Sequence, residues 1–329
     1  MVFQTPKIEP VPSGTSRPLW SVMIPTFNCA KYLRQTVESV LTQSPHVDQM
    51  QIEVVDDVST KDDPEAVVRE VAEGRVDFYR KPRNEGAIAN FNTCIQRSRG
   101  HLVHILHGDD YVLPGFYSKL ADLAKDHPSV SAFFVRCQVV EEDGSLDHIS
   151  GRIQHLAQPS RSPGNLFYRN DLLAPGVVIR RSFYETHGGF LPSLVHTADW
   201  EMWVRAISQG TGLWINELLA AYRCFSSNHT CSLARTAENL RDYLRLTEIF
   251  DSNLYDYDRT RFRAAVAQRA KWQEKRFTDT GDKDAAFFNY KVWRELTPWT
   301  QRWETKLLGL LASYRRNFFS RSWNELRHS

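Results

Sequence analysis

The 329-residue sequence lacks any long hydrophobic run, since no stretch approaches the roughly 18–20 apolar residues that a membrane-spanning helix needs. Its first residues have no apolar core behind a basic start, so they do not have the pattern of a signal peptide. We expect residues 1–17 to form a disordered tail. Any membrane contact is therefore expected to be peripheral.

An excess of one charge is also missing, because 41 Lys and Arg residues stand against 39 Asp and Glu residues. Such a balance does not predict the basic surface that nucleic acid needs, so we expect no nucleic-acid partner. The five cysteines form no CxxC pair, and an odd number would leave one thiol unpaired in an oxidising compartment. These features favour a cytoplasmic location, with peripheral contact at the inner membrane face as the alternative.

Short apolar runs alternate with helical patterns in the first part of the chain, which predicts an α/β fold with a doubly wound, mostly parallel sheet. The composition, 42% hydrophobic and 24% charged, suits one large globular domain over residues 18–233 followed by a helical region over 234–329. The expected strands are 19–24, 51–55, 76–80, 101–106, 131–140 and 174–179. The expected helices are 30–41, 64–73, 181–187 and 199–209, and residues 84–98 are expected to begin as a loop and continue as a helix.

Two adjacent carboxylates, Asp109 and Asp110, follow the predicted strand 101–106 directly. Burying like charges side by side is costly, and a divalent cation is the usual compensation. Mg²⁺ or Mn²⁺ bound here would bridge the carboxylates to a diphosphate and improve it as a leaving group. The alternative is that the pair only opens the turn before Pro114.

A second carboxylate pair, Asp56 and Asp57, ends the predicted strand 51–55. Such groups accept hydrogen bonds from a ribose or a base edge, although a solvated turn would explain them without a ligand. Polar clusters also follow the neighbouring strands: PTFN at 25–28, NEG at 84–86 and HGDD at 107–110. Because ligands bind beyond the carboxyl ends of parallel strands, we expect these clusters to converge on one edge of the sheet.

Asp199 opens the amphipathic helix 199–209, where we expect it at the N-cap position. The helix dipole and free backbone donors stabilise an ionised carboxylate there, so Asp199 is a candidate general base for an acceptor hydroxyl. The alternative is a cap without a catalytic role. Trp200 and Trp203 on the same helix are typical core residues, although Trp200 could line a sugar site.

Six motifs occur in the order found in glycosyltransferase family 2, the inverting group with the GT-A fold, which the chain resembles from residue 19 to about 233. They are VMIPTFN, VVDDVSTKD, NEGAIANFN, GHLVHILHGDDYVLPGF, GGFLPSL with TADWEMWVRA, and LAAYRCFSSNHTCS. The resemblance implies a nucleotide-diphosphate sugar donor, a divalent cation and an acceptor that is a glycan or a lipid-linked glycan. It also implies transfer in cell-surface polysaccharide or lipid-linked glycan assembly.

The resemblance assigns site residues by position. Asp109 and Asp110 correspond to the metal and diphosphate motif, and Asp199 corresponds to the catalytic base. The residues implied to line the nucleotide pocket are Pro25, Thr26, Asn28, Asp56 or Asp57, Asn84 and Gly86, with Asp109 beside the diphosphate.

The chain departs from the family pattern at two places. Ala198 stands where many members have a Glu before the base, and Phe225 stands where relatives commonly have a His. His229 is the nearest substitute for that His, and the alternative is a solvated loop residue. The resemblance does not extend to the C-terminal helices, where residues 303–323 mix aromatic and basic side chains and predict peripheral membrane contact or, alternatively, packing on the catalytic domain.

Other function classes fit less well. An oxidoreductase with a similar sheet would need a GxGxxG turn after the first strand, where this chain has PTFN. The Gly-rich first loop of a sugar nucleotidyltransferase is absent too. The main alternative to an enzyme is a catalytically inactive GT-A-like protein that binds sugar nucleotides or serves as a scaffold.

Overall fold

A computed structural model describes residues 4–44, 47–151, 158–225, 229–253 and 255–297. The predicted membrane-contacting stretch at 303–323 lies outside these residues. The chain divides into two compact units. The first contains residues 1–229 and returns for Glu248–Tyr257, and the second contains Thr230–Thr247 and the residues from Asp258 onward.

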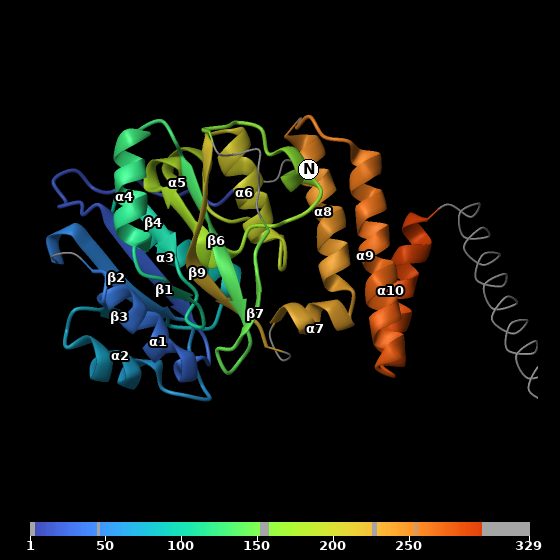
Figure 1. The fold of residues 1–329 in the computed structure, drawn as a ribbon, viewed down its shortest axis with the longest axis horizontal. Helices are drawn as coiled ribbons and strands as arrows, with labels where there is room; N and C mark the ends of the chain where they lie inside the picture. The colour runs from blue at the N-terminus through green and yellow to red at the C-terminus, as the bar shows by residue number, and fades with distance from the viewer. Residues whose placement is uncertain (1–3, 45–46, 152–157, 226–228, 254, 298–329) are drawn as a thin grey trace, which may run out of the picture. The chain divides into compact units, whose positions relative to one another are not determined.

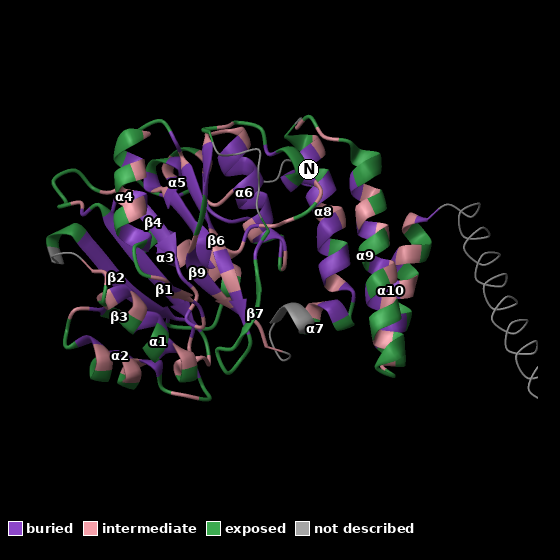
Figure 2. Ribbon diagram, in the orientation of Figure 1, coloured by how far each residue is buried: buried purple, intermediate pink, exposed green. Residues whose placement is uncertain are grey.

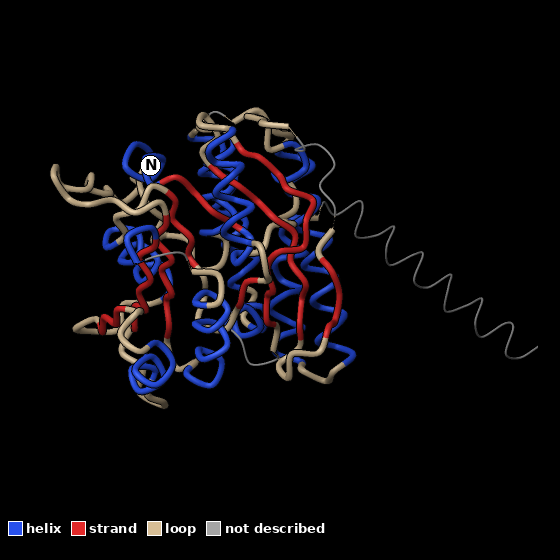
Figure 3. Tube along the Cα trace, turned by 60° about the vertical axis from the view of Figure 1, so that its left-hand side comes forward, coloured by secondary structure: helices blue, strands red, loops and turns tan. Residues whose placement is uncertain are grey.

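The first unit is built on a mixed β-sheet with helices beside it, so the predicted α/β class is confirmed (Figures 1 and 3). Its N-terminal half is parallel, in the order β3, β2, β1, β4. Every residue of β1 and β2 is buried, as expected for strands covered on both faces. The elements of this half are β1 (Trp20–Thr26), α1 (Ala30–Leu41), β2 (Met50–Asp56), α2 (Pro64–Ala72), β3 (Asp77–Arg80), α3 (Ala87–Arg97) and β4 (Leu102–Ile105).

The second half of the sheet continues from β4 through β8, β6, β9 and β5, with β7 paired to β6. β8 is antiparallel to β4 and β6, whereas β6 and β9 are parallel. The sequence analysis did not predict β5, β7 or β9. The elements here are β5 (Tyr111–Val112), α4 (Phe116–Asp126), β6 (Ala132–Val140), β7 (Leu146–Ile149), β8 (Val177–Arg180), α5 (Arg181–His187), α6 (Ala198–Ser208) and β9 (Gly212–Arg223).

Burial follows the sheet and the inner faces of its helices (Figure 2). α1 and α4 each place apolar side chains on one face in this core, whereas almost all of α6 is buried. Burial on all sides gives α6 a fixed position, which matters because its first turn carries Asp199.

The prediction of a disordered tail over 1–17 is wrong for the part that the structure describes. The Ile8 side chain is 2% exposed, and the Gly189 N–H donates to the Pro6 carbonyl. The Arg181 guanidinium also donates to the Glu9 carbonyl. Apolar burial and backbone pairing therefore hold this segment, although its sequence is rich in Pro and polar residues.

The second unit is helical in its described part. α9 (Arg259–Asp279) and α10 (Lys283–Leu296) are joined by a short turn, and Asp258 and Asp282 cap their N-termini. α7 (His229–Arg235) and α8 (Glu238–Ser252) precede them and cross the boundary between the units. None of the helices in the described ranges has the length and apolar character needed to cross a bilayer.

Candidate active site

The polar clusters after β1, β2 and β4 lie side by side at the carboxyl ends of these strands. The Asp57 N–H donates to the Thr26 carbonyl at 3.0 Å, and the Gly108 N–H donates to the Pro25 carbonyl at 3.1 Å. These backbone bonds extend the parallel sheet pairing beyond the strands themselves. The structure thus brings PTFN, VVDD and HGDD together at one edge, as the sequence analysis expected.

Asn28 organises the loop that follows β2. Its φ of 52° turns the chain, and its side-chain carbonyl accepts the N–H groups of Thr60 at 2.8 Å and Lys61 at 2.9 Å. The Asn28 N–H donates to the Ser59 hydroxyl. The Asn28 amide oxygen is therefore engaged in holding the loop after β2. The nearby Thr26 hydroxyl and the Cys29 thiol form a hydrogen bond of 2.8 Å.

The Asp56 side chain is held by hydrogen bonds inside the fold. Its side chain is 0% exposed. One carboxylate oxygen accepts from the Ser59 hydroxyl at 2.5 Å, and the other accepts from Arg80 Nε at 2.8 Å. Asp56 and Asp57 are both buried and engaged by protein groups, and the assignment of one of them to the nucleotide pocket stays a prediction.

Asp57 holds the NEG segment in place. Its carboxylate accepts the N–H groups of Glu85 and Gly86, the latter at 2.8 Å, and the Asn84 side chain donates to the Asp57 carbonyl at 2.7 Å. The buried Lys81 ammonium lies 2.9 Å from the same carboxylate. Asn84 and Gly86 are thus positioned by Asp57.

We expect Asp57→Ala to lower the free energy of unfolding by about 3 kcal/mol, because it leaves the buried Lys81 ammonium without its closer partner. Urea unfolding at pH 7 measures this cost. The double variant Asp57→Ala, Lys81→Met is the control and should recover part of the loss, since no buried charge is left unpaired. A cost below about 1 kcal/mol for the single variant would contradict the structural role.

His107, Asp109 and Asp110 form a cluster suited to a cation. Their ligand atoms all lie within 4.8 Å of one another. Asp110 is 1% exposed, and one of its oxygens accepts the Arg223 N–H at 2.8 Å. Its other oxygen, Oδ2, is buried without a hydrogen-bond partner among the described residues. An unsatisfied buried carboxylate oxygen fits a bound divalent cation.

The electrostatics of this cluster also favour a cation. Burial raises the pKa of Asp109, and burial together with the charge of Asp109 raises the pKa of Asp110 well above its usual range. Burial lowers the pKa of the His107 ring, and Asp109 opposes that shift. The sequence analysis missed His107, although its position two residues before Asp109 could have indicated a further candidate ligand.

A metal ion should stabilise the protein more at higher pH. Because the folded pKa values of Asp109 and Asp110 are raised, ionisation of the pair costs stability as pH rises through them, and a cation offsets that cost. At a fixed concentration of about 100 times its Kd at pH 8, Mn²⁺ should raise Tm by about 5 °C at pH 8 and by less at pH 5.5, where it binds more weakly. Scanning calorimetry with K⁺ at matched ionic strength is the control, and equal shifts at both pH values would refute the coupling.

Arg223, the last residue of β9, locks the loop that carries both acids. Besides its N–H bond to Asp110, its Nε donates to the Asp109 carbonyl at 3.0 Å. Its remaining donors reach the Glu142 carbonyl at 2.9 Å and the Gln35 side chain at 2.6 Å. A strand that the sequence analysis did not predict therefore sets the orientation of the acidic pair.

Asp199 lies in the first turn of α6, but Thr197 occupies the N-cap position, so the N-cap assignment was wrong by two residues. The half-buried Asp199 carboxylate accepts the Trp200 N–H at 2.6 Å, and Asn170 Nδ2 lies 3.5 Å from its other oxygen. Within the same helix Glu201 forms a buried ion pair with Arg205.

The Glu201–Arg205 pair anchors α6 to the turn after α5. Arg205 donates to the carbonyls of His187 at 2.6 Å and Gly189 at 2.8 Å, and both charged side chains are nearly inaccessible. Each guanidinium donor is thereby directed to a fixed acceptor. This arrangement sets the position of the first turn of α6 and of Asp199 on it.

The charges of Asp199 and of the acidic pair all influence the phenol of Tyr222. Burial raises the pKa of its phenol, and the charges of Asp110, Asp109, Cys224 and Asp199 raise it further. Charges from distant parts of the chain therefore act on this one phenol. The sequence analysis did not single out Tyr222, because its role depends on the course of β9.

Trp200 does not line a sugar site, which corrects that assignment. Its side chain is 5% exposed, and its indole N–H donates to the Leu166 carbonyl at 2.5 Å. Trp203 packs edge-on against Phe134 and Phe190, as expected of a core residue. His229 begins α7, and its side chain lies outside the described part of the structure.

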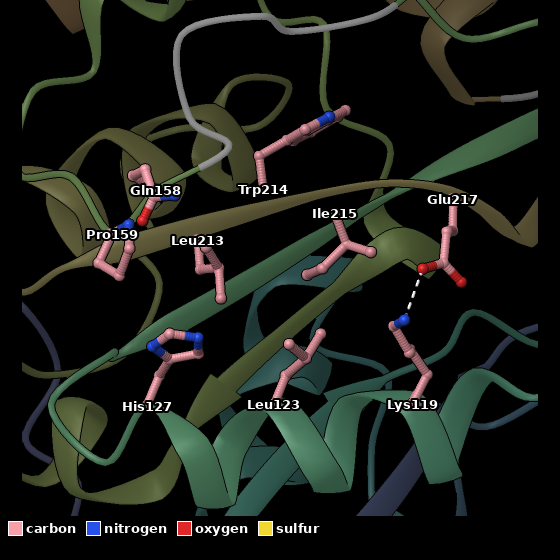
Figure 4. A pocket seen from close by; sticks show the side chains of 9 residues that line it. All are labelled: Lys119, Leu123, His127, Gln158, Pro159, Leu213, Trp214, Ile215 and Glu217. Atoms are coloured by element: carbon pink, nitrogen blue, oxygen red, sulfur yellow. Dashed lines mark ion pairs between the residues drawn. The ribbon is translucent and has the colours of Figure 1, made fainter.

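A pocket of about 300 Å³ lies between α4 and the first half of β9 (Figure 4). It is mainly apolar, with an ion pair of 2.7 Å between Lys119 and Glu217 at one side. None of the candidate site residues lines it, so the polar chemistry of the strand ends is separate from this pocket. Its lining residues are Lys119, Leu123, His127, Gln158, Pro159, Leu213, Trp214, Ile215 and Glu217.

Comparison with protein families matches residues 21–186 to the model described as Glycosyl transferase family 2. An uncharacterised protein of Mycobacterium tuberculosis is 26% identical over 243 residues, which cover 70% of this chain and 75% of that protein. An uncharacterised glycosyltransferase of Mycoplasma pneumoniae is 30% identical over 162 residues, covering 47% of this chain and 54% of that protein. Chondroitin synthase of Escherichia coli is 29% identical over 143 residues, covering 43% of this chain and 20% of that protein.

Solved structures share the fold. TarS 1–349 of S. aureus in complex with UDP-GlcNAc has a TM-score of 0.53 at 14% identity, covering 85% of this chain and 93% of that chain. The mannosyltransferase PcManGT of Pyrobaculum calidifontis, in complex with GDP-Man and Mn²⁺, has a TM-score of 0.52 at 16% identity, covering 94% and 90%. At these identities the likeness concerns the arrangement of helices and strands.

Proposed function

The chain belongs to glycosyltransferase family 2 and has the GT-A fold, and on this basis we propose that it is an inverting, metal-dependent glycosyltransferase. It moves a sugar from a nucleotide-diphosphate sugar to an acceptor hydroxyl. The observation that carries the proposal is the cluster of His107, Asp109 and Asp110, with Asp110 Oδ2 buried and without a hydrogen-bond partner among the described residues, next to the strand ends that carry PTFN and Asp57. UDP-GlcNAc and GDP-Man with Mn²⁺ in the complexes of similar fold support a donor of this class.

The residues divide into donor-binding and proton-accepting groups. Asp109 and Asp110 would hold Mg²⁺ or Mn²⁺, which when bound neutralises the charge of the diphosphate. Pro25 and Thr26 line the nucleotide pocket together with the segment of Asn84 and Gly86 that Asp57 holds. The donor diphosphate then lies at the carboxyl ends of the strands, as ligands of such sheets do.

The transfer itself needs one base. Asp199 accepts the proton of the acceptor hydroxyl while the hydroxyl oxygen bonds to the anomeric carbon. The bond between that carbon and the diphosphate oxygen breaks on the opposite face, so the configuration inverts and the nucleoside diphosphate leaves. The Glu201–Arg205 pair fixes the position of α6 and therefore of the base. A single displacement of this kind needs no covalent sugar–enzyme intermediate.

A donor panel tests the proposal. We expect Mn²⁺-dependent release of nucleoside diphosphate from at least one of UDP-GlcNAc, UDP-glucose, UDP-galactose and GDP-mannose, even without acceptor, because water can replace the hydroxyl. Excess EDTA should suppress the release. Tight donor binding by calorimetry with no release from any donor would instead identify the inactive, sugar-nucleotide-binding alternative.

The acceptor and the location follow as finer proposals. Cell-surface polysaccharide or lipid-linked glycan is the acceptor class that suits the family, and the similarity to a chondroitin synthase supports a glycan chain. The protein acts in the cytoplasm, with the basic, aromatic stretch at 303–323 contacting the inner membrane face peripherally. His229 remains a candidate contact for the diphosphate on the strength of the resemblance.

A further inference from the structure

His107 places a nitrogen ligand beside the acidic pair. Its side chain is 28% exposed, and Nδ1 lies 3.7 Å from Asp110 Oδ2. That separation exceeds hydrogen-bonding distance, so the imidazole does not satisfy the buried oxygen. Two facing ligand atoms, one nitrogen and one oxygen, are therefore left without a bond to each other.

The ring is built into the site rather than free to turn. It stacks on Phe91 with a centroid distance of 5.0 Å and an interplanar angle of 11°. Phe91 in turn packs edge-on against Phe190 at 5.5 Å. The backbone of Phe190 both donates to and accepts from the Asn92 side chain, at 2.8 and 2.9 Å. The imidazole plane is thus held by a chain of contacts that begins in α3.

The spacing of the cluster suits a single small cation. Metal–ligand bonds to nitrogen and carboxylate oxygen are roughly 2.0–2.2 Å, so opposite ligands lie about 4 Å apart. The ligand atoms of His107, Asp109 and Asp110 are within 4.8 Å of one another, which is close to this separation. The buried Asp110 Oδ2, unpartnered among the described residues, points into this space.

We propose that His107 is the third protein ligand of the cation, completing a mixed nitrogen–oxygen site that prefers Mn²⁺ to Mg²⁺. This inference rests on the metal-dependent function proposed above. Mg²⁺ favours oxygen ligands, whereas an imidazole suits transition metals better. The nitrogen ligand therefore decides which cation the acidic pair retains when both are available.

Electron paramagnetic resonance of the full chain with Mn²⁺ alone tests the ligand directly, without donor or turnover. Electron spin-echo modulation should show a coupled ¹⁴N nucleus in the wild type. The signal should disappear in His107→Ala and His107→Asp and persist in His148→Ala, a control that removes an exposed histidine of β7. Thermal unfolding of each variant confirms that it is folded.

Competition with Mg²⁺ supplies the second measurement. The wild type should prefer Mn²⁺ by roughly tenfold or more, and His107→Asp, which restores an all-oxygen site, should lower that preference about tenfold while still binding both ions. Bound Mn²⁺ without ¹⁴N modulation, or modulation that persists in folded His107→Ala, would overturn the assignment of His107 while leaving metal-dependent transfer intact. No Mn²⁺ binding at all would overturn it too, and the EDTA arm of the donor panel then decides the proposed function separately.

Discussion

Asp199→Asn should lower the rate of sugar transfer by about 10²–10⁴-fold, because the amide cannot accept the proton of the acceptor hydroxyl. The substitution keeps the size of the side chain and an oxygen that can accept the Trp200 N–H. Donor affinity, measured by calorimetry, should change little, since the proposed role of Asp199 concerns the acceptor hydroxyl and not the nucleotide. The loss should therefore fall on kcat rather than on KM for the donor.

Two matched variants sharpen this experiment. Asp122→Asn removes a carboxylate from the exposed face of α4 and should leave transfer unchanged. Asp199→Glu keeps a carboxylate one methylene away and should retain more activity than the Asn variant. Transfer by Asp199→Asn at the wild-type rate would remove Asp199 from the role of base, and equal losses for Glu and Asn would indicate a role that depends on shape alone.

Asp110→Asn should abolish most metal-dependent turnover, by about 10²–10³-fold, without destabilising the metal-free protein. The Asn side-chain oxygen can still accept the Arg223 N–H, so the loop keeps its anchor. The variant loses a buried charge whose ionised form burial and Asp109 both disfavour. Its metal-free stability at pH 8 should thus equal or exceed that of the wild type, while its affinity for Mn²⁺ falls.

Calorimetric unfolding with and without Mn²⁺, together with donor turnover, separates these effects. Asp126→Asn on the exposed part of α4 is the control and should change none of the three quantities. If Asp110→Asn unfolded at a much lower temperature than the wild type in the absence of metal, the Asp110 carboxylate would stabilise the fold itself. Its role as a metal ligand would then be contradicted.

Asp110→Asn is thus expected to lower activity while keeping or raising stability. Such opposite effects are typical of a site that places like charges close together. Arg223 does not neutralise Asp110 by a direct side-chain ion pair. Its guanidinium instead bonds to backbone carbonyls and to Gln35, and its backbone N–H binds the Asp110 carboxylate. The protein therefore orients the acidic pair precisely enough for a ligand while leaving charge for a cation to balance.

Local patterns in the sequence were sufficient to predict the order of strands and helices in the parallel half of the sheet. They also predicted that each polar cluster lies at the end of a strand. Apolar runs, helical periodicity and Pro64 at a helix start are properties of neighbouring residues, so they can be recognised without coordinates. The convergence of PTFN, VVDD and HGDD followed from the geometry of parallel strands alone. The family resemblance then supplied the expected roles.

Side-chain direction and distant pairing were decided only by the tertiary structure. Asp56 and Asp57 are neighbours in sequence, yet it is the Asp56 carboxylate that accepts hydrogen bonds from Ser59 and Arg80 inside the fold. Trp200 follows the candidate base but turns to the Leu166 carbonyl. β9 brings Arg223 to the acidic pair from a point 113 residues away, and no local pattern encodes such a contact. Burial and long-range hydrogen bonding thus selected, among chemically suitable side chains, those that remain available for function.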